Sequence, residues 1–150
     1  NGGKWACFWR NVMSQEEFFK KELVKELRKA EAFMKREENI EKKIYYFSAA
    51  YGITNRTYRY AFSDDVLLAD LVLTAGYQAL SDRLQRVKSG DITVKLDEAI
   101  FKKIEEGLRQ LADAFENNES ILKPLKVILT ATFSTSGAGN YIRERGMFEL

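Results

Sequence analysis

Histidine, cysteine and proline are almost missing from this chain of 150 residues, which has none of the first and one each of the others. Without histidine, the protein lacks the usual acid–base group near neutral pH and the commonest ligand of transition metals. Serine–histidine and cysteine–histidine catalytic pairs are therefore excluded. The single Cys7 cannot form a disulfide or a zinc site within the chain, which favours a reducing cytoplasm. We expect no metal or cofactor, and we favour a non-catalytic protein.

Charge of one sign and long hydrophobic runs are missing as well. The 24 basic and 22 acidic residues give a net charge of +2, whereas a protein that mainly binds nucleic acid usually has a strong basic excess. No run reaches the roughly 20 apolar residues that a transmembrane helix requires, and residues 1–13 lack the continuous apolar core of a signal peptide. We expect no membrane span and a cytoplasmic protein. The mixed Lys and Glu content is typical of thermophilic proteins.

The most apolar stretch, Val66–Leu80, contains one ionisable group, Asp70, and its apolar residues run nearly all the way round a helix. A helix that is apolar on all sides is normally enclosed by other helices. A chain of this length commonly forms one domain. We therefore predict a single all-α domain over residues 1–150, a bundle of about five helices around a buried central helix at about 64–88, with short terminal helices.

Capping residues and glycines predict where these helices begin and end. Side chains suited to a helix start are Ser14, Asn39, Ser63, Asp97 and Ser120. Gly52 should end the second helix, which makes residues 53–62 a connection with room for a helical turn begun by Thr54. Gly90 should end the central helix. The β-branched residues of 92–96 favour a short extended segment. Gly76 lies inside the central helix and indicates a close helix crossing, because glycine is otherwise unfavourable there.

Both tryptophans lie in the first 13 residues, on one apolar stripe with helical spacing. Its members are Trp5, Phe8, Trp9, Val12 and Met13. We expect a short helix docked on the bundle, separate from the helix that a capping box at Ser14–Glu17 begins. The alternative is an exposed anchor for a second subunit or a membrane surface, with Trp5, Phe8 and Trp9 as the interface.

Basic and aromatic residues alternate just before the central helix, and two further arginines lie within that helix. The candidate nucleic-acid patch consists of Arg56, Tyr58, Arg59, Tyr60, Arg83 and Arg86. Such side chains can stack on unpaired bases and contact phosphates. The alternative is that the tyrosines pack on the bundle while the arginines face solvent.

Carboxylates spaced by one helical turn form a candidate Mg²⁺ site of a helical phosphohydrolase. This acidic cluster consists of Glu37, Glu38, Glu41, Asp65 and Asp70. The alternative is a solvated helix face paired with lysines. Asp70 on its own is expected to be paired or hydrogen-bonded, with an arginine, a tyrosine hydroxyl or a lysine as partner, because an unpaired buried carboxylate is costly.

The run Thr135–Asn140 is rich in glycine and hydroxyl groups, but it follows a predicted helix and no lysine follows its last glycine. We expect a plain loop there and not a phosphate loop. Because no catalytic constellation is present and aromatic residues lie near both ends, we favour a non-catalytic interaction or scaffold subunit that is a homo-oligomer or binds a protein partner. The alternatives are a nucleic-acid-binding subunit of a larger assembly and a Mg²⁺-dependent hydrolase.

Overall fold

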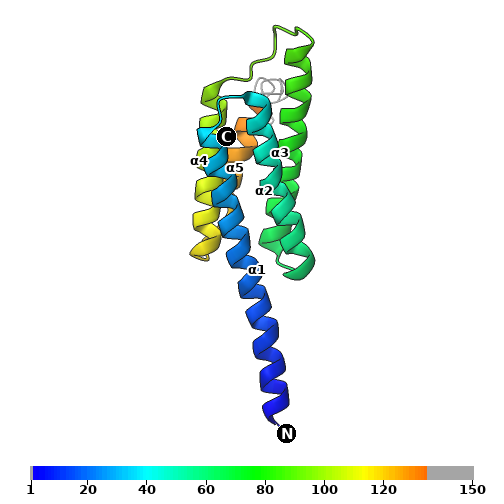
Figure 1. Cartoon of the computed structure of the whole chain (residues 1–150), viewed down its shortest axis with the longest axis vertical. Coiled ribbons are helices and arrows are strands. Elements are labelled where there is room, and N and C mark those ends of the chain that lie inside the picture. Colours follow the sequence, from blue (N-terminus) through cyan, green and yellow to red (C-terminus); the bar gives the residue numbers. More distant parts are fainter. Residues whose placement is uncertain (1, 135–150) are drawn as a thin grey trace.

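The computed structural model describes the backbone of residues 2–134 and the side chains of residues 15–133. Five helices account for most of this range, and no strand lies within it (Figure 1). They are α1 (Gly2–Arg36), α2 (Ile40–Tyr60), α3 (Asp64–Lys88), α4 (Glu98–Glu116) and α5 (Leu122–Ser134). The predicted all-α class is confirmed. The predicted loop Thr135–Asn140 and the short helix expected after it lie outside the described residues.

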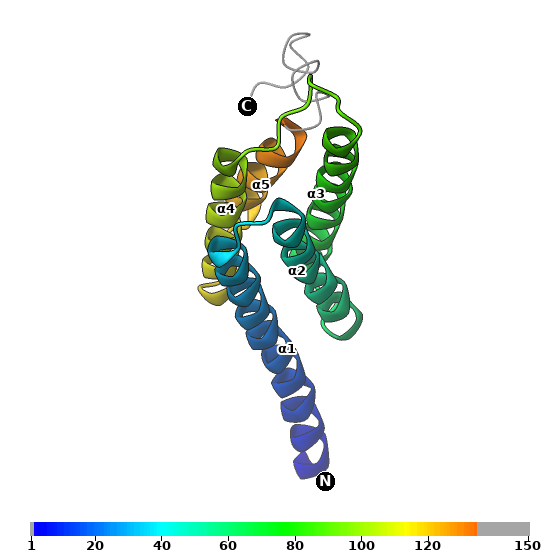
Figure 2. The same ribbon diagram turned by 45° about the horizontal axis from the view of Figure 1, so that its top comes forward.

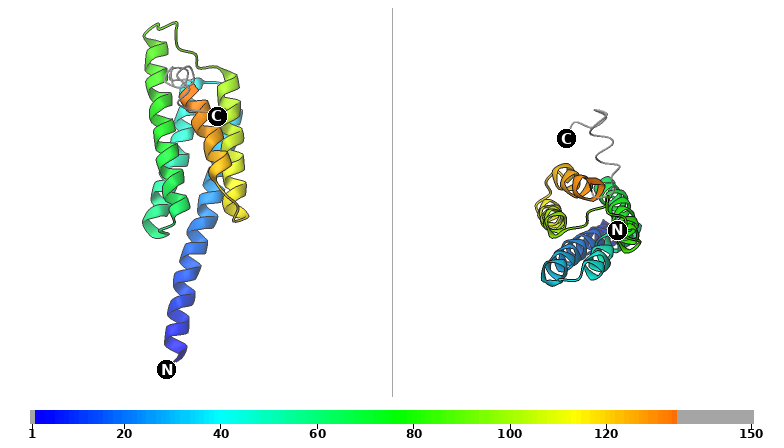
Figure 3. Two further views of the ribbon diagram at one scale, coloured as in Figure 1. Left: turned by 180° about the vertical axis from the view of Figure 1, so that it is seen from behind. Right: turned by 90° about the horizontal axis from the view of Figure 1, so that it is seen from above.

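The five helices form a closed ring, which Figure 3 shows from above. Around the ring, α1 packs on α2, α2 on α3, α3 on α5, α5 on α4, and α4 on α1. Successive helices run in opposite directions, so the short turns after α2 and α4 lie at the same end of the ring (Figure 1). Each helix contributes a large, fully buried side chain to the core. Examples are Leu27, Phe47, Leu73, Phe101 and Ile128.

Helix α3 has the predicted bounds, but it is one member of the ring and is not enclosed on all sides. Its buried side chains follow one face of the helix, and its neighbours in the ring are α2 and α5. On the opposite face, Leu71 is 59% exposed. The apolar residues of this stretch are therefore divided between a core face and a solvent face, a division that composition alone does not reveal.

Helix α1 runs without a break from Gly2 to Arg36. The predicted separate N-terminal helix and the predicted helix start at Ser14 are therefore wrong. No glycine or proline lies between Gly3 and Gly52 to interrupt the backbone. The serine and glutamate of a capping-box pattern are also compatible with the interior of a helix, where they can face solvent.

Helix α2 continues past Gly52 to Tyr60, so the predicted connection over 53–62 is wrong for most of its length. The core-facing positions in this second half are Thr54 and Thr57, both of which are buried. Because threonine is polar, the sequence shows no apolar stripe in this half of the helix. The Thr54 hydroxyl oxygen lies 2.8 Å from the Tyr51 carbonyl oxygen, a distance typical of hydroxyls inside helices. Gly52 lowers the helix propensity here without ending the helix.

The predicted starts of three helices are confirmed. Asn39 accepts a hydrogen bond from the amide of the third residue of α2, and Asp97 does the same for α4. Ser63 occupies the N-cap position of α3 in an extended conformation. At the other end of α3, Gly90 has a φ of 85°, which is the left-handed conformation typical of glycine after a helix.

The predicted extended segment at 92–96 is instead a turn followed by irregular chain, and no strand forms there. The Asp91 carboxylate accepts hydrogen bonds from the Thr93 amide at 2.9 Å and the Thr93 hydroxyl at 2.6 Å. These bonds lower the pKa of Asp91 below its ordinary value. The backbone conformation here is therefore decided by a local hydrogen-bonded turn and not by the strand preference of β-branched residues.

The close crossing predicted at Gly76 is confirmed. A Cβ atom at this position would lie 3.2 Å from the Thr132 Cγ2 of α5 and 3.5 Å from the Phe47 Cζ of α2. The absence of a side chain lets α3 approach both neighbours closely. The glycine thus offsets its low helix propensity through packing.

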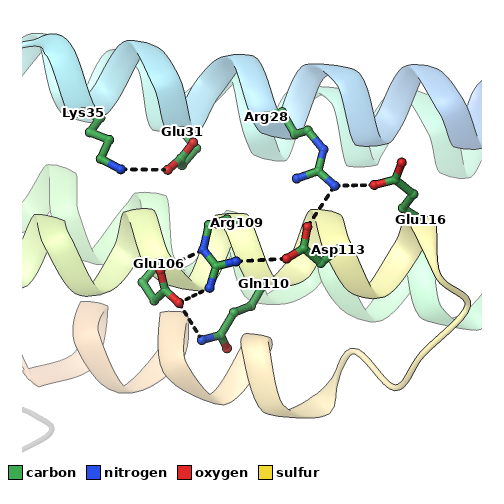
Figure 4. A network of polar contacts seen from close by, with 8 residues as sticks. All are labelled: Arg28, Glu31, Lys35, Glu106, Arg109, Gln110, Asp113 and Glu116. Atoms are coloured by element: carbon green, nitrogen blue, oxygen red, sulfur yellow. Dashed lines mark hydrogen bonds and ion pairs between the residues drawn. The ribbon is translucent and has the colours of Figure 1, made fainter.

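A network of charged side chains joins α1 to α4 at the surface (Figure 4). Arg28 of α1 lies 2.9 Å from an Asp113 carboxylate oxygen and also pairs with Glu116. Along α4, Arg109 bridges Glu106 and Asp113. The hydrogen bonds from Arg109 and, secondarily, from a neighbouring glutamine lower the pKa of Glu106 from 4.5 to about 2.

We expect Glu106→Gln to reduce stability at neutral pH but not in strong acid. Because the folded state lowers the pKa of Glu106, its ionised form favours folding above pH 4.5, and this contribution is lost as the pH falls toward 2. The side chain is about half exposed, so solvent screening limits the difference to less than about 1 kcal/mol. Urea unfolding at pH 6 and at pH 2 measures it. Glu38→Gln, outside the network, is the control, and a difference that grew in acid would contradict the expectation.

Candidate interaction surface

The first half of α1 projects beyond the ring, past the ends of the other helices (Figures 1 and 2). The predicted docking of this segment on its own bundle is therefore not seen. The side chains of residues 2–14 are outside the described set, but the helical register of the backbone relates their positions. Trp5 and Trp9 precede the core residues Leu23 and Leu27 by eighteen residues, or about five full turns. In helical register, the sequence positions of the stripe therefore lie in line with the core-facing positions of α1.

Helix α1 joins the ring at about Glu16. Just beyond that point the Phe19 ring stacks on the Tyr60 ring of α2, with 4.6 Å between centroids. One residue further on, Lys20 donates a hydrogen bond to the Asn118 side chain in the turn after α4. The part of α1 before Glu16 comprises 14 residues, which extend about 20 Å.

A pocket of about 310 Å³ lies where the projecting half of α1 leaves the ring. Its walls come from α1, the turn between α2 and α3, and the end of α4 with the turn that follows. The apolar part of the lining includes Phe62, Val66 and Phe115. Phe62 stands at the α2–α3 turn with 80% of its surface exposed. We refer to this pocket as the end pocket.

The end pocket has an unsatisfied polar group and an acidic lining. Thr57 lines it and is 1% exposed, yet its hydroxyl has no hydrogen-bond partner among the described residues. A buried hydroxyl without a partner is unfavourable by roughly 1–3 kcal/mol. The ionisable side chains of the lining are Glu16, Lys20, Asp65 and Glu119. Three carboxylates against one ammonium give the lining a net negative charge.

The structure does not bring the predicted arginine–tyrosine patch together. Arg56 and Arg59 are exposed near the end of α2, where Tyr60 stacks on Phe19 and Tyr58 is half-buried. Arg83 lies on α3, about 28 Å along the helix axis from the first residue of α3. It is buried, donates to the Lys95 carbonyl at 3.2 Å, and has a pKa lowered by its burial. Arg86, one turn beyond, pairs with an aspartate of its own helix. Two exposed arginines remain at the end where the end pocket lies.

The acidic cluster is divided between the two ends of the ring. Glu37, Glu38 and Glu41 lie where α1 passes into α2, and Glu41 pairs with Lys88 at 2.9 Å. Asp65 lies beyond the far end of α2, a helix about 30 Å long. Within the described residues no group of three or more acidic or other metal-binding side chains could hold a metal ion. The structure therefore does not bring these five carboxylates together.

Asp70 is buried and is held by uncharged partners. Its carboxylate accepts hydrogen bonds from the Thr54 hydroxyl at 3.1 Å and from the Asn55 side-chain amide at 3.3 Å. The expected arginine, tyrosine or lysine partner is replaced by two residues of α2, because α2 is helical in the region predicted to be a connection. This contact joins α2 to α3 and does not face the end pocket.

Sequence reasoning missed a buried ion pair. Lys43 of α2 and Glu105 of α4 are 2% and 6% exposed, and their charged atoms lie 3.2 Å apart. The Lys43 ammonium also donates to the Met34 carbonyl in the last turn of α1 at 2.6 Å. Lys43 lies one turn before the buried Phe47, which is the only sequence signal for its burial.

No family model matches the chain, and comparisons with curated proteins and with solved structures gave no match. Within residues 2–134, none of the helices has the length and apolar character needed to cross a membrane.

Proposed function

We propose that the protein is a non-catalytic helical scaffold subunit that self-associates through the projecting half of α1. The observation that carries this proposal is the continuation of the core-facing stripe of α1 beyond the ring. A helix with one apolar face gains most of its stability by burying that face against another element. No other helix of the described chain covers this part of α1 (Figure 1).

A second copy of the chain is the simplest partner because three large apolar residues of the stripe are evenly spaced along the helix. Trp9 lies at the centre of the stripe, and Trp5 and Met13 lie four residues to either side of it. An antiparallel pair of such helices, with its two-fold axis at Trp9, presents the same surface from both copies. Self-complementarity of this kind is what a symmetric dimer requires.

Sedimentation velocity over a range of concentrations tests the proposal. We expect a mass above the 17.3 kDa of one chain. Trp9→Glu should weaken association by at least about 30-fold, because a buried tryptophan at the centre of an interface typically contributes 2 kcal/mol or more. Deleting residues 1–13 should return the protein to 17.3 kDa.

Leu71→Glu is the matched control, since it places the same charge on the exposed face of α3 and should leave the mass unchanged. A mass of 17.3 kDa at all concentrations would contradict the proposal. A monomer that sediments with anionic lipid vesicles would replace the second copy with a membrane surface as the partner.

A further inference from the structure

We propose that the end pocket binds a small organic cation, an ammonium ion carried on an apolar body. Two properties of the pocket point to this class of ligand. Its lining combines an apolar surface with carboxylates that have no partner among the described residues, and it is walled by three separate parts of the fold. The proposal is independent of self-association, because every residue that carries it lies in one copy of the chain.

The end pocket has the size and the enclosure of a small-molecule site. Its walls come from α1, from the turn between α2 and α3, and from the end of α4 with the turn that follows. Its volume of about 310 Å³ lies at the lower end of the roughly 300–1,000 Å³ typical of small-molecule pockets. Walls on three sides favour a compact ligand over a partner helix, which requires an extended groove.

The apolar part of the lining includes an aromatic ring that the bundle leaves largely uncovered. Phe62 lines the pocket with 80% of its surface exposed, although phenylalanine is normally buried. Its ring makes a T-shaped contact with the Tyr58 ring, with 5.8 Å between centroids. Val66 and Phe115 add further apolar surface to the lining. Aromatic rings attract ammonium ions, and apolar side chains can cover the body that carries the charge.

The charged part of the lining is acidic and unpaired. Glu16, Asp65 and Glu119 line the pocket, and none of these carboxylates has an ion-pair or side-chain hydrogen-bond partner among the described residues. Lys20, the one ammonium of the lining, donates instead to the Asn118 side chain. No group of three acidic side chains in the described chain could hold a metal ion. A bulkier organic cation is therefore favoured over a metal.

The charges around the pocket do not offset this excess. Arg10, the last charged residue of α1 before Glu16, precedes it by six residues, or about 9 Å along the helix axis. Arg28 pairs with two acidic residues of α4, outside the lining. Six acidic and four basic residues lie within four sequence positions of the lining, namely Glu17, Glu22, Asp64, Asp70, Asp113 and Glu116 against Lys21, Arg56, Arg59 and Lys123.

Three small molecules that share a phenyl body but differ in charge test the proposal. They are the 2-phenylethylammonium ion, the neutral 2-phenylethanol and the phenylacetate anion, each titrated at pH 7 into the ¹⁵N-labelled full chain. Amide chemical shifts report binding, and those of Val66, Phe115 and Asn118 locate it at the end pocket. We expect the ammonium ion to bind at least tenfold more tightly than the alcohol, and the anion less tightly than either. Raising the ionic strength should weaken the binding of the ammonium ion but not of the alcohol.

Removing charges of opposite sign should move the affinity in opposite directions. Glu119→Gln removes a carboxylate of the lining and should weaken ammonium binding roughly threefold to tenfold. Lys20→Gln removes the competing cation and should strengthen binding by a similar factor, while the new amide can still donate to Asn118. A purely structural role of these two side chains would not give opposite signs.

Phe62→Ala removes the exposed ring and should weaken the binding of both the ammonium ion and the alcohol about fivefold or more. Phe18→Ala is the matched control. Phe18 is 58% exposed and lines a separate pocket of about 370 Å³ between α1 and α2, where Glu26 is already paired with Lys29. This variant should leave both affinities unchanged.

The proposal is overturned by equal affinities for the three molecules, by the absence of a saturable shift with the ammonium ion, or by shifts confined to amides elsewhere. Equal effects of Phe62→Ala and Phe18→Ala would also contradict it. Lys20, Phe62 and Glu119 are exposed, so their variants should remain folded, which circular dichroism checks. Sedimentation measures self-association separately, so failure of this proposal would leave the scaffold proposal intact.

Discussion

Lys43→Met is expected to lower the free energy of unfolding by about 3–5 kcal/mol, the cost of leaving one member of a buried ion pair without its partner. Glu105 would be left in a site where it is 6% exposed, with the Lys43 ammonium no longer 3.2 Å away. The last turn of α1 would also lose the donor to the Met34 carbonyl. Urea unfolding followed by circular dichroism, at one fixed protein concentration, measures the change.

The double variant Lys43→Met, Glu105→Leu distinguishes loss of packing from loss of charge pairing. Replacing both members by apolar residues of similar size is often neutral or stabilising, so most of the lost stability should return. Lys88→Met removes one member of the exposed pair with Glu41 and should change stability by about 1 kcal/mol or less. Equal effects of Lys43→Met and Lys88→Met would contradict the buried-pair explanation.

Helix ends were predictable from sequence where the signal is local. An asparagine or aspartate side chain that accepts a nearby amide is decided by a few neighbouring residues, which is why Asn39 and Asp97 are correctly assigned. Gly90 is likewise decided by its own backbone conformation. The same local signals fail at Ser14 and Gly52, where the surrounding chain favours helix and the residue is tolerated inside it.

The arrangement of the helices depends on contacts between residues far apart in the chain. Composition shows that Val66–Leu80 is apolar, but only the ring order determines that Leu71 faces solvent while Leu73 is buried. The buried Lys43 is equally hidden, because its partner Glu105 is 62 positions away. A sequence pattern describes one helix at a time and cannot show which helix lies opposite.

The candidate site also has one part that can be read from the sequence and one part that cannot. The apolar stripe from Trp5 to Met13 is visible in the sequence, together with the alternative that it binds a second subunit. The end pocket is not visible, since its lining comes from α1, the α2–α3 turn and α4. Thr57 in particular looks like an ordinary polar residue until the structure buries its hydroxyl.

Gly107→Ala is expected to lower the free energy of unfolding by about 1–3 kcal/mol, which is the usual cost of overpacking a core. A Cβ atom at this position of α4 would lie 2.5 Å from the Ile128 Cγ1 of α5. The contacted atom is part of a fully buried, branched side chain, so it cannot move aside cheaply. The intrinsic preference of a helix for alanine, about 1 kcal/mol, opposes this loss without cancelling it. Thermal or urea unfolding measures the difference.

Gly52→Ala is the matched control, because it makes the same change in a helix where nothing lies within 4 Å of the new Cβ. It should raise stability by about 0.5–1 kcal/mol. Ile128→Ala supplies the second test: in that background the steric conflict is gone, so Gly107→Ala should become neutral or stabilising, a coupling that additive effects cannot produce. If Gly107→Ala instead matched Gly52→Ala in the original chain, α4 and α5 would not approach as closely as the ring requires.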